Sequence, residues 1–270
     1  MAQLYSLVIV LHTIFGLAGL VLFWFPACLQ KGGIWHKRLG RYFVLTMTVA
    51  TATGLLMASM MYLDPIGIQR HPVDLSPEAM ALISAQNRNN ALFLALLCVL
   101  VFTTLQRSMT ALRAQNDRQL LRRPSMLFLP VTLGVFGFVV LCIAIRHGVY
   151  LFGGFAVVAI LLSAVNLHYA FKPRLRPREW VLEHLGNSLG SGIGAHTGFL
   201  VFGASRLLRE ALPGNLMLIP WFLPTVVGIA AIVFWGTRYA RLLGYGEHRA
   251  NRSGAALNAR TDGLAQSEIQ

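Results

Sequence analysis

The chain has 270 residues, of which 56% are hydrophobic and 12% charged, about half the charged share of an average soluble domain. Apolar runs of about twenty residues recur along it, and no stretch between them is long enough to form a soluble core. The formal net charge of +13 lies mostly in short loops between these runs, which is typical of a membrane surface rather than of a nucleic-acid-binding face. We therefore expect a protein of the lipid bilayer that binds no nucleic acid.

Seven apolar runs predict an all-α fold, a polytopic membrane helix bundle with about seven transmembrane helices. The third run is short and continues into a basic helix, and Pro220 and Pro224 break the seventh. The runs cover residues 3–27, 42–62, 90–105, 126–145, 149–170, 185–202 and 216–235.

These runs make residues 1–236 the predicted transmembrane domain, and the longest connection is the outer loop at residues 64–88. Within that loop, Ser76 and Pro77 predict the start of a short helix on the outer surface, with Ser76 as its cap. Residues 237–270 are a basic cytoplasmic tail without an apolar period, and we expect this tail to be disordered.

Lysine and arginine residues predict the orientation of the bundle. Loops on one side, together with the tail, contain eighteen of them and loops on the other side contain five, in strict alternation along the chain. Because basic loops are retained in the cytoplasm, we expect an outside N-terminus and a cytoplasmic C-terminus. The expected location is the inner (cytoplasmic) membrane of a bacterium, crossed several times.

The sequence lacks the residues that several kinds of membrane and enzyme chemistry require. None of the ten acidic residues lies in the middle of a predicted span, which disfavours ion-coupled pumps and intramembrane aspartyl enzymes. No phosphate-binding glycine loop, zinc-type cysteine pair or His-Glu-x-x-His run occurs. The three cysteines, Cys28, Cys98 and Cys142, are too few and too scattered for a disulfide framework.

Two histidines lie near the middle of predicted spans, and an ionisable group within the membrane is a candidate for function. His12 and His196 are both about halfway along their spans, so they can share a layer of the bilayer. Two imidazoles from different helices are the axial ligands that a b-type haem needs, and Gly16 and Gly192, one turn away, would let the macrocycle approach the backbone. Haem iron is the only metal that this pattern suggests. The alternative is that His12 bonds a neighbouring helix and that Gly16 and Gly19 serve helix packing.

A second group of histidines lies at the cytoplasmic ends of the spans. His36, His168 and His184 come from different segments and can form a second haem site, a metal site or, with Asn166, a quinone-contacting site. The alternative, which we favour, is that they are solvated interfacial residues among basic loops that attract anionic lipid.

The sixth run contains the sharpest pattern in the chain, glycine at every fourth position. Such a stripe lets another helix pack backbone to backbone. On the other face of the same helix, Ser188, Gly192 and His196 can line a cavity. The stripe consists of Gly186, Gly190, Gly194 and Gly198.

The first sixty residues resemble an uncharacterised bacterial membrane-protein family, the domain of unknown function 2306. That family is similar in having a first helix with His-x-x-x-Gly, followed by a basic loop with Lys-Gly and His-x-x-x-Gly-Arg. The resemblance implies a polytopic bacterial membrane protein with histidines at recurring places, and it implies no activity. The residues that carry it are His12, Gly16, Lys31, Gly32, His36, Gly40, Arg41, Tyr42, Thr53 and Gly54, with a looser match from His184 to Gly190.

The leading hypothesis from the sequence is a membrane redox protein, an oxidoreductase that binds haem b through His12 and His196. Its partner would be membrane quinone or another membrane redox carrier. The competing hypothesis is a non-enzymatic protein, either a small-molecule transporter or an assembly or interaction factor, in which the histidines are structural. A lipid-modifying enzyme is a weaker third idea, because only Glu183 is placed to orient the inner-face histidines.

Overall fold

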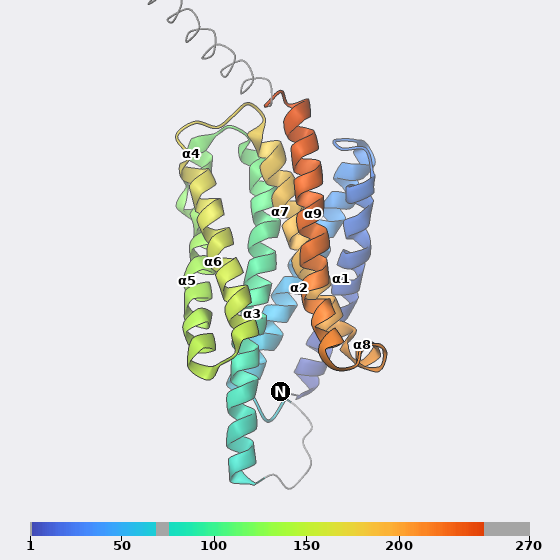
Figure 1. Cartoon of the computed structure of the whole chain (residues 1–270), viewed down its shortest axis with the longest axis vertical. Coiled ribbons are helices and arrows are strands. Elements are labelled where there is room, and N and C mark those ends of the chain that lie inside the picture. Colours follow the sequence, from blue (N-terminus) through green and yellow to red (C-terminus); the bar gives the residue numbers. More distant parts are fainter. Residues whose placement is uncertain (1, 69–75, 246–270) are drawn as a thin grey trace, which may run out of the picture.

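The computed structural model describes residues 2–68 and 76–245, and in this part of the chain every regular element is helical. Seven long helices run roughly parallel to one another (Figure 1). The long helices are α1 (Ala2–Cys28), α2 (Ile34–Leu63), α3 (Pro77–Ala114), α5 (Pro124–His147), α6 (Tyr150–Phe171), α7 (Glu179–Gly198) and α9 (Ile219–Leu242). Short helices connect some of them, namely α4 (Arg118–Leu121), the π-helix η1 (Phe199–Gly203), α8 (Ser205–Ala211) and the 3-10 helix η2 (Gly214–Leu218).

Six of these helices are long and apolar enough to cross a membrane, among the residues that the structure describes: α1, α2, α3, α5, α6 and α9 together with η2. This agrees with the predicted all-α membrane bundle. The sixth predicted span corresponds to α7 with η1, and α7 is not among the six because glycine, serine and asparagine replace many of its apolar residues.

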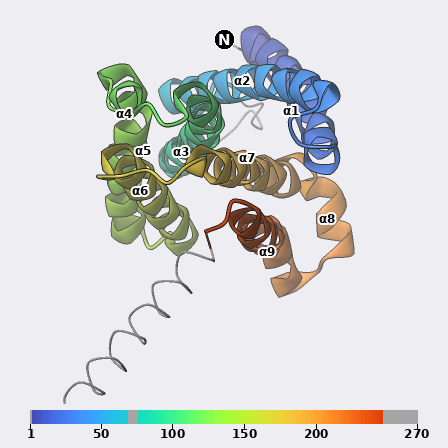
Figure 2. The ribbon, with the colours of Figure 1, turned by 90° about the horizontal axis from the view of Figure 1, so that it is seen from above.

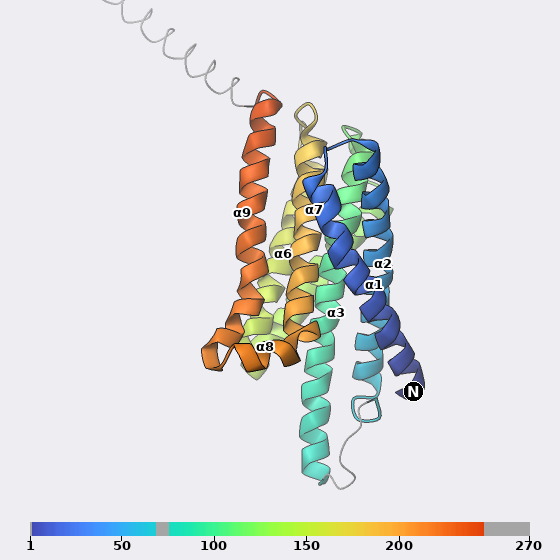
Figure 3. The ribbon, with the colours of Figure 1, turned by 90° about the vertical axis from the view of Figure 1, so that its right-hand side faces the viewer.

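The helices are arranged in pairs around α3 and α7. Viewed from above, α1 and α2 lie on one side of this central pair and α5 and α6 on the other, while α9 packs against α7 (Figure 2). The view in Figure 3 shows α7 between α9 and α1, with α8 below α9 and α7. The central core includes Met47 of α2, Leu96 and Leu100 of α3 and Leu133 of α5.

The N-terminal end of α1 and the C-terminal end of α9 lie at opposite ends of the bundle (Figure 1). The connections between α1 and α2, between α3 and α5 and between α6 and α7 lie at the same end as the last turn of α9. These segments and the helix turns next to them contain most of the lysine and arginine residues of the described chain, and we call this end the basic end.

The outer loop is shorter than predicted, because α3 already begins at Pro77. Ser76 caps it as expected, accepting a hydrogen bond from the Ala79 amide at 3.2 Å. The helix is not a separate surface element, however: its first turns extend beyond the other helices and continue into the third span (Figure 3). About three turns into α3, Asn87 Nδ2 donates a hydrogen bond to the Pro65 carbonyl at 2.7 Å, which joins this part of the helix to the loop after α2.

The last span and the tail also differ from expectation. Neither proline breaks α9, because Pro220 occupies the first turn, where no helical N–H is needed, and the helix continues through Pro224. The helix extends to Leu242, six residues into the segment predicted as tail. Residues 243–245 form a turn, and residues 246–270 of that segment lie outside the described residues.

Candidate functional site

His12 packs α1 against α2. Its Nδ1 lies 2.9 Å from the Ala50 carbonyl oxygen and 3.4 Å from the Thr53 hydroxyl. A Cβ added at Gly54 would lie 3.1 Å from His12 Cε1 and 2.8 Å from Cys98 Sγ, so the imidazole fills the space that this glycine leaves. His12 therefore makes the interhelical contact that the packing alternative expects.

The structure does not bring His12 and His196 together. The His196 ring lies edge-on to Phe23 and Trp24, with ring centroids 5.3 and 5.5 Å apart. Phe23 is eleven residues after His12 on the same helix, which is about 16 Å along its axis. The layers of the two histidines differ because the second half of α7, which contains Gly192 and His196, contacts the last turns of α1. This pair does not have the geometry of two axial ligands on one iron.

One of the two glycines next to these histidines, Gly192, also differs from the haem expectation. Gly16 has no atom within 4 Å of an added Cβ, whereas the space at Gly192 is occupied by the Phe23 ring. The face of α7 that was expected to line a cavity is therefore packed against α1 at this level. His196 Nδ1 lies 2.7 Å from the Gly192 carbonyl oxygen of its own helix.

The second histidine group comes together in part. His36 Nδ1 lies 3.1 Å from the Pro26 carbonyl oxygen at the end of α1, and His184 is near enough to His36 and Lys31 for their charges to interact. His168 is exposed on α6 and does not join them. Asn166, expected near these histidines, instead contacts Arg107.

His184 belongs to a short chain of polar contacts between α3 and α7. The Ser108 hydroxyl lies 2.8 Å from His184 Nδ1 and 2.6 Å from the Ser188 hydroxyl, and the Ser108 carbonyl oxygen lies 3.2 Å from the same Nδ1. These contacts join the two central helices near the basic end.

The middle of the glycine stripe packs against α3. A Cβ at Gly194 would lie 2.5 Å from Val101 Cγ2, and one at Gly190 would lie 3.6 Å from Thr104 Cγ2. Gly186 and Gly198, at the two ends of the stripe, have nothing within 4 Å of an added Cβ. Close packing thus uses two of the four glycines.

The most unusual group in the bundle is a buried arginine on α3. Arg107 is 2% exposed, and its guanidinium donates from Nε to Asn166 Oδ1 at 3.2 Å and from Nη2 to the Asn166 carbonyl at 3.5 Å. Asn166 is also 2% exposed, and its Nδ2 donates to the Leu162 carbonyl at 2.8 Å. A buried cation without full compensation is costly, so it is a candidate for function.

Tyr169 of α6 and Glu183 of α7 complete what we call the arginine cluster: Arg107, Asn166, Tyr169, Glu183 and Asn187. Arg107, Tyr169 and Glu183 are near enough to interact electrostatically. Glu183 is partly buried, and its Oε1 accepts from Asn187 Nδ2 at 3.1 Å. Three helices thus supply one cation, one carboxyl group and several neutral polar groups.

Two donors of this cluster have no hydrogen-bond partner within the part of the chain that the structure describes: Arg107 Nη1 and the Tyr169 hydroxyl. Tyr169 is 6% exposed, so both side chains are almost fully buried. Among the described residues, the only ion pair within 4.0 Å joins Lys172 and Glu179, so Arg107 and Glu183 are not in direct contact. The cluster has donors left for a further acceptor.

Polar contacts also organise the rim of the basic end, next to the cluster. Lys172 Nζ donates to Glu179 Oε1 at 2.5 Å, and the Arg176 amide donates to Glu179 Oε2 at 2.8 Å. The Tyr245 hydroxyl, which follows α9, donates to the Pro177 carbonyl at 2.6 Å, and burial raises the pKa of this hydroxyl. The α6–α7 connection is thereby held against the end of α9.

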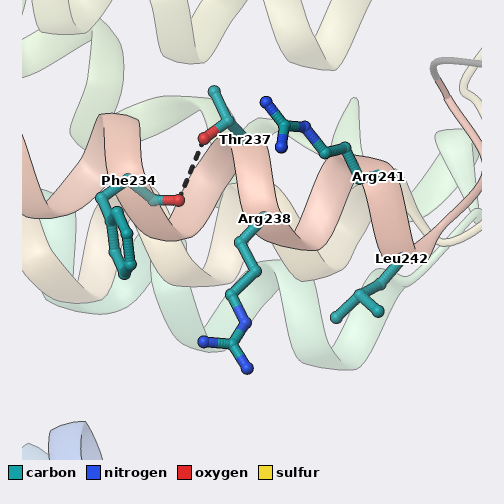
Figure 4. Close-up of a pocket in the computed structure, with 5 residues that line it drawn as sticks. All are labelled: Phe234, Thr237, Arg238, Arg241 and Leu242. Atoms are coloured by element: carbon teal, nitrogen blue, oxygen red, sulfur yellow. Dashed lines mark hydrogen bonds between the residues drawn. The ribbon is translucent and has the colours of Figure 1, made fainter.

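A surface pocket on α9 does not form a comparable site. A pocket near the basic end of α9 is lined by side chains of that helix alone (Figure 4): Phe234, Thr237, Arg238, Arg241 and Leu242. Its two arginines point away from each other, so no group converges on a ligand there. Among residues 2–68 and 76–245, no three His, Cys, Asp or Glu side chains are grouped to hold a metal ion.

One feature of the sequence is consistent with a buried Arg107: Thr103 and Ala111, one helix turn to either side, are small and uncharged. Counting basic residues per loop does not use this feature. Assigned to a basic loop, Arg107 is in fact on the same helix face as Thr103 and Ala111, one turn to either side, and both are buried. A face that stays buried beyond the apolar run indicates that the helix continues inside the bundle. Its partners on α6 and α7 depend on tertiary packing and have no such signal.

Comparison of the chain with protein-family models, with curated proteins and with solved structures finds no match. The resemblance to the domain of unknown function 2306 therefore stays a prediction from sequence.

Proposed function

We propose that this protein crosses the membrane seven times, with its basic end in the cytoplasm. Six apolar helices and α7 make seven, and an odd number agrees with termini of the bundle at opposite ends. The excess of lysine and arginine at one end supports the orientation.

Within this topology we propose that the protein is a transporter of a small polar solute, which binds at the arginine cluster. The observation that carries this proposal is the guanidinium of Arg107, buried between helices with one nitrogen unpaired. A charged group inside a membrane bundle usually marks a substrate or ion pathway, because its burial is too costly for packing alone.

The helix that contributes Glu183 supports transport rather than a static role. α7 is rich in glycine, of which Gly186 and Gly198 meet no neighbour, and it continues directly into the π-helix η1. Segments of π-helix are frequent at functional sites, and the open space beside Gly186 and Gly198 leaves room for those turns of α7 to move.

Haem binding stays a prediction that no contact in the structure favours. His12 and His196 belong to different layers of the bundle, and each Nδ1 is close to a backbone carbonyl. A redox role would therefore need ligands other than this pair.

The proposal is tested by thermal unfolding of the purified protein in detergent with a panel of added salts. The probes are sodium chloride, nitrate, formate and sulfate, with ammonium and guanidinium chloride as cationic probes. A ligand that binds only the folded state raises the unfolding temperature with its concentration. We expect at least one probe to stabilise the wild type, and Arg107→Gln to abolish that response.

A matched control is Arg122→Gln. Arg122 donates to the carbonyls of Ala170 and Phe171 at 3.1 and 3.3 Å, at the basic end but outside the arginine cluster. This variant should lose stability and keep the response to the probe. If no probe stabilises the wild type, or if Arg107→Gln responds as the wild type does, the cluster is not the solute site.

A further inference from the structure

We propose that the arginine cluster binds a small monovalent anion together with one proton, which is held on the Glu183 carboxyl group. This inference rests on the proposed function, because it names the solute class of the same site. It follows from which groups are unpaired and from the charges that surround them.

The unpaired groups of the cluster are hydrogen-bond donors. Arg107 Nη1 comes from α3 and the Tyr169 hydroxyl from α6, and both side chains are near enough to Glu183 to interact with its charge. Thr103, one turn from Arg107 on the same face of α3, is 0% exposed, and its hydroxyl also has no partner within the described chain. The guanidinium N–H can only donate and the two hydroxyls can donate as well as accept, so together they suit an electron-rich ligand, and the charge of the guanidinium favours an anion.

The charges facing Glu183 decide what must accompany that anion. Arg107 interacts with it from α3 and Tyr169 from α6. Glu179 is one turn earlier on α7, and Lys172 is in the preceding connection. Glu179 and Lys172 form an ion pair, so their charges compensate each other. The remaining balance is between the Arg107 cation and the Glu183 carboxyl group.

A buried site of low dielectric favours zero net charge, because an uncompensated ion loses its hydration without recovering it. With Glu183 ionised, Arg107 is balanced and an anion would leave one negative charge in excess. With Glu183 protonated, one monovalent anion restores neutrality. Binding is therefore coupled to transfer of one proton from water to a Glu183 oxygen, and release of the anion returns that proton.

The experiment measures proton uptake during anion binding to the full-length protein in detergent. Sodium chloride or sodium nitrate is added at weak buffering near neutral pH, with a pH-sensitive dye as the readout and calorimetry for occupancy. The wild type should take up about one proton per bound anion, and its Kd should rise about tenfold per pH unit where free Glu183 is ionised. Sodium sulfate should give neither signal, since its second charge stays unbalanced.

Three variants separate the roles of the two charges. Glu183→Gln imitates the protonated carboxyl, so it should bind the anion without proton uptake and with a Kd that does not change with pH. Arg107→Gln should bind none. Glu179→Gln removes a carboxylate paired with Lys172 and should keep both binding and proton uptake. Each variant is first checked for a single symmetric peak in size-exclusion chromatography.

Infrared difference spectra of the wild type provide a second test, which does not depend on whether Glu183→Gln folds. Addition of chloride should produce a protonated carboxyl band, which shifts when glutamate is labelled with carbon-13. Anion binding without proton uptake would overturn this inference and leave the proposed solute site intact. If none of the salts in the thermal panel binds, the proposed function itself fails.

Discussion

The four glycines of the stripe on α7 give a graded prediction, because the structure places them in different surroundings. Sequence periodicity alone treats them as equivalent. An added Cβ would meet Val101 Cγ2 at 2.5 Å at Gly194, would make an ordinary contact of 3.6 Å at Gly190 and would meet nothing within 4 Å at Gly186. We predict that Gly194→Ala is destabilising, Gly190→Ala nearly neutral and Gly186→Ala neutral or stabilising.

The magnitudes follow from packing and from helix propensity. Val101 is 6% exposed, so its methyl group cannot turn out of the way, and overpacking of this kind costs about 1–3 kcal/mol. At Gly186 the methyl group meets open space, and alanine in a helix interior gains roughly 0.5–1 kcal/mol over glycine. Because both alanines gain the same helix propensity, the two variants should differ by the overpacking cost alone, about 1–3 kcal/mol.

Thermal unfolding of the three variants, measured by fluorescence-detected size-exclusion chromatography in one detergent, gives their order. Each kcal/mol corresponds to about 2–4 °C in the unfolding temperature for a chain of this size. Equal losses at Gly186 and Gly194 would refute the placement of α3 against the middle of the stripe. A loss of stability in Gly186→Ala alone would also refute this placement.

The remaining predictions concern other contacts between helices. Absorption spectra of the purified protein should show no haem band that disappears in both His12→Ala and His196→Ala; such a band would mean that the two share an iron. Asn166→Ala removes the partner of a buried guanidinium and should cost about 2 kcal/mol of stability, measured by urea unfolding in mixed micelles. Ser163→Ala removes a single bond of 2.7 Å to the Pro130 carbonyl, so its cost should be roughly 0.6 kcal/mol, and a loss as large as that of Asn166→Ala would contradict this assignment.

Much of the fold could be predicted because bilayer-spanning helices need long apolar runs, and these are visible in sequence. Helix α7 was found despite its polar residues, since its run of residues 185–202 still falls between two basic segments. The start of α3 was predicted from Ser76 and Pro77, but its continuity with the third span was not, because nothing local marks where a helix leaves the membrane. Which helices pack against one another could not be predicted either, because apolar helix faces of similar composition do not identify their partners.

The candidate site was predictable only in part for the same reason. The polar residues of the basic end could be named, yet whether His36 would meet His184 or His168 depends on which helices are neighbours. Equal depth was expected for His12 and His196, and the contact of α7 with the last turns of α1 places them in different layers. Arg107 was counted as a loop cation, since charge counting does not distinguish a buried guanidinium from a solvated one.

The central claim, that a small anion crosses the bundle through the arginine cluster, is tested most directly by tracer uptake into proteoliposomes. Chloride-36 and iodide-125 are the probes, with the wild type, Arg107→Gln and Arg122→Gln reconstituted at equal density beside protein-free vesicles. We predict uptake by the wild type and by Arg122→Gln that exceeds the protein-free rate at least tenfold, and uptake by Arg107→Gln at the protein-free rate. Wild-type uptake equal to that of protein-free vesicles, or undiminished uptake by Arg107→Gln, would contradict the account.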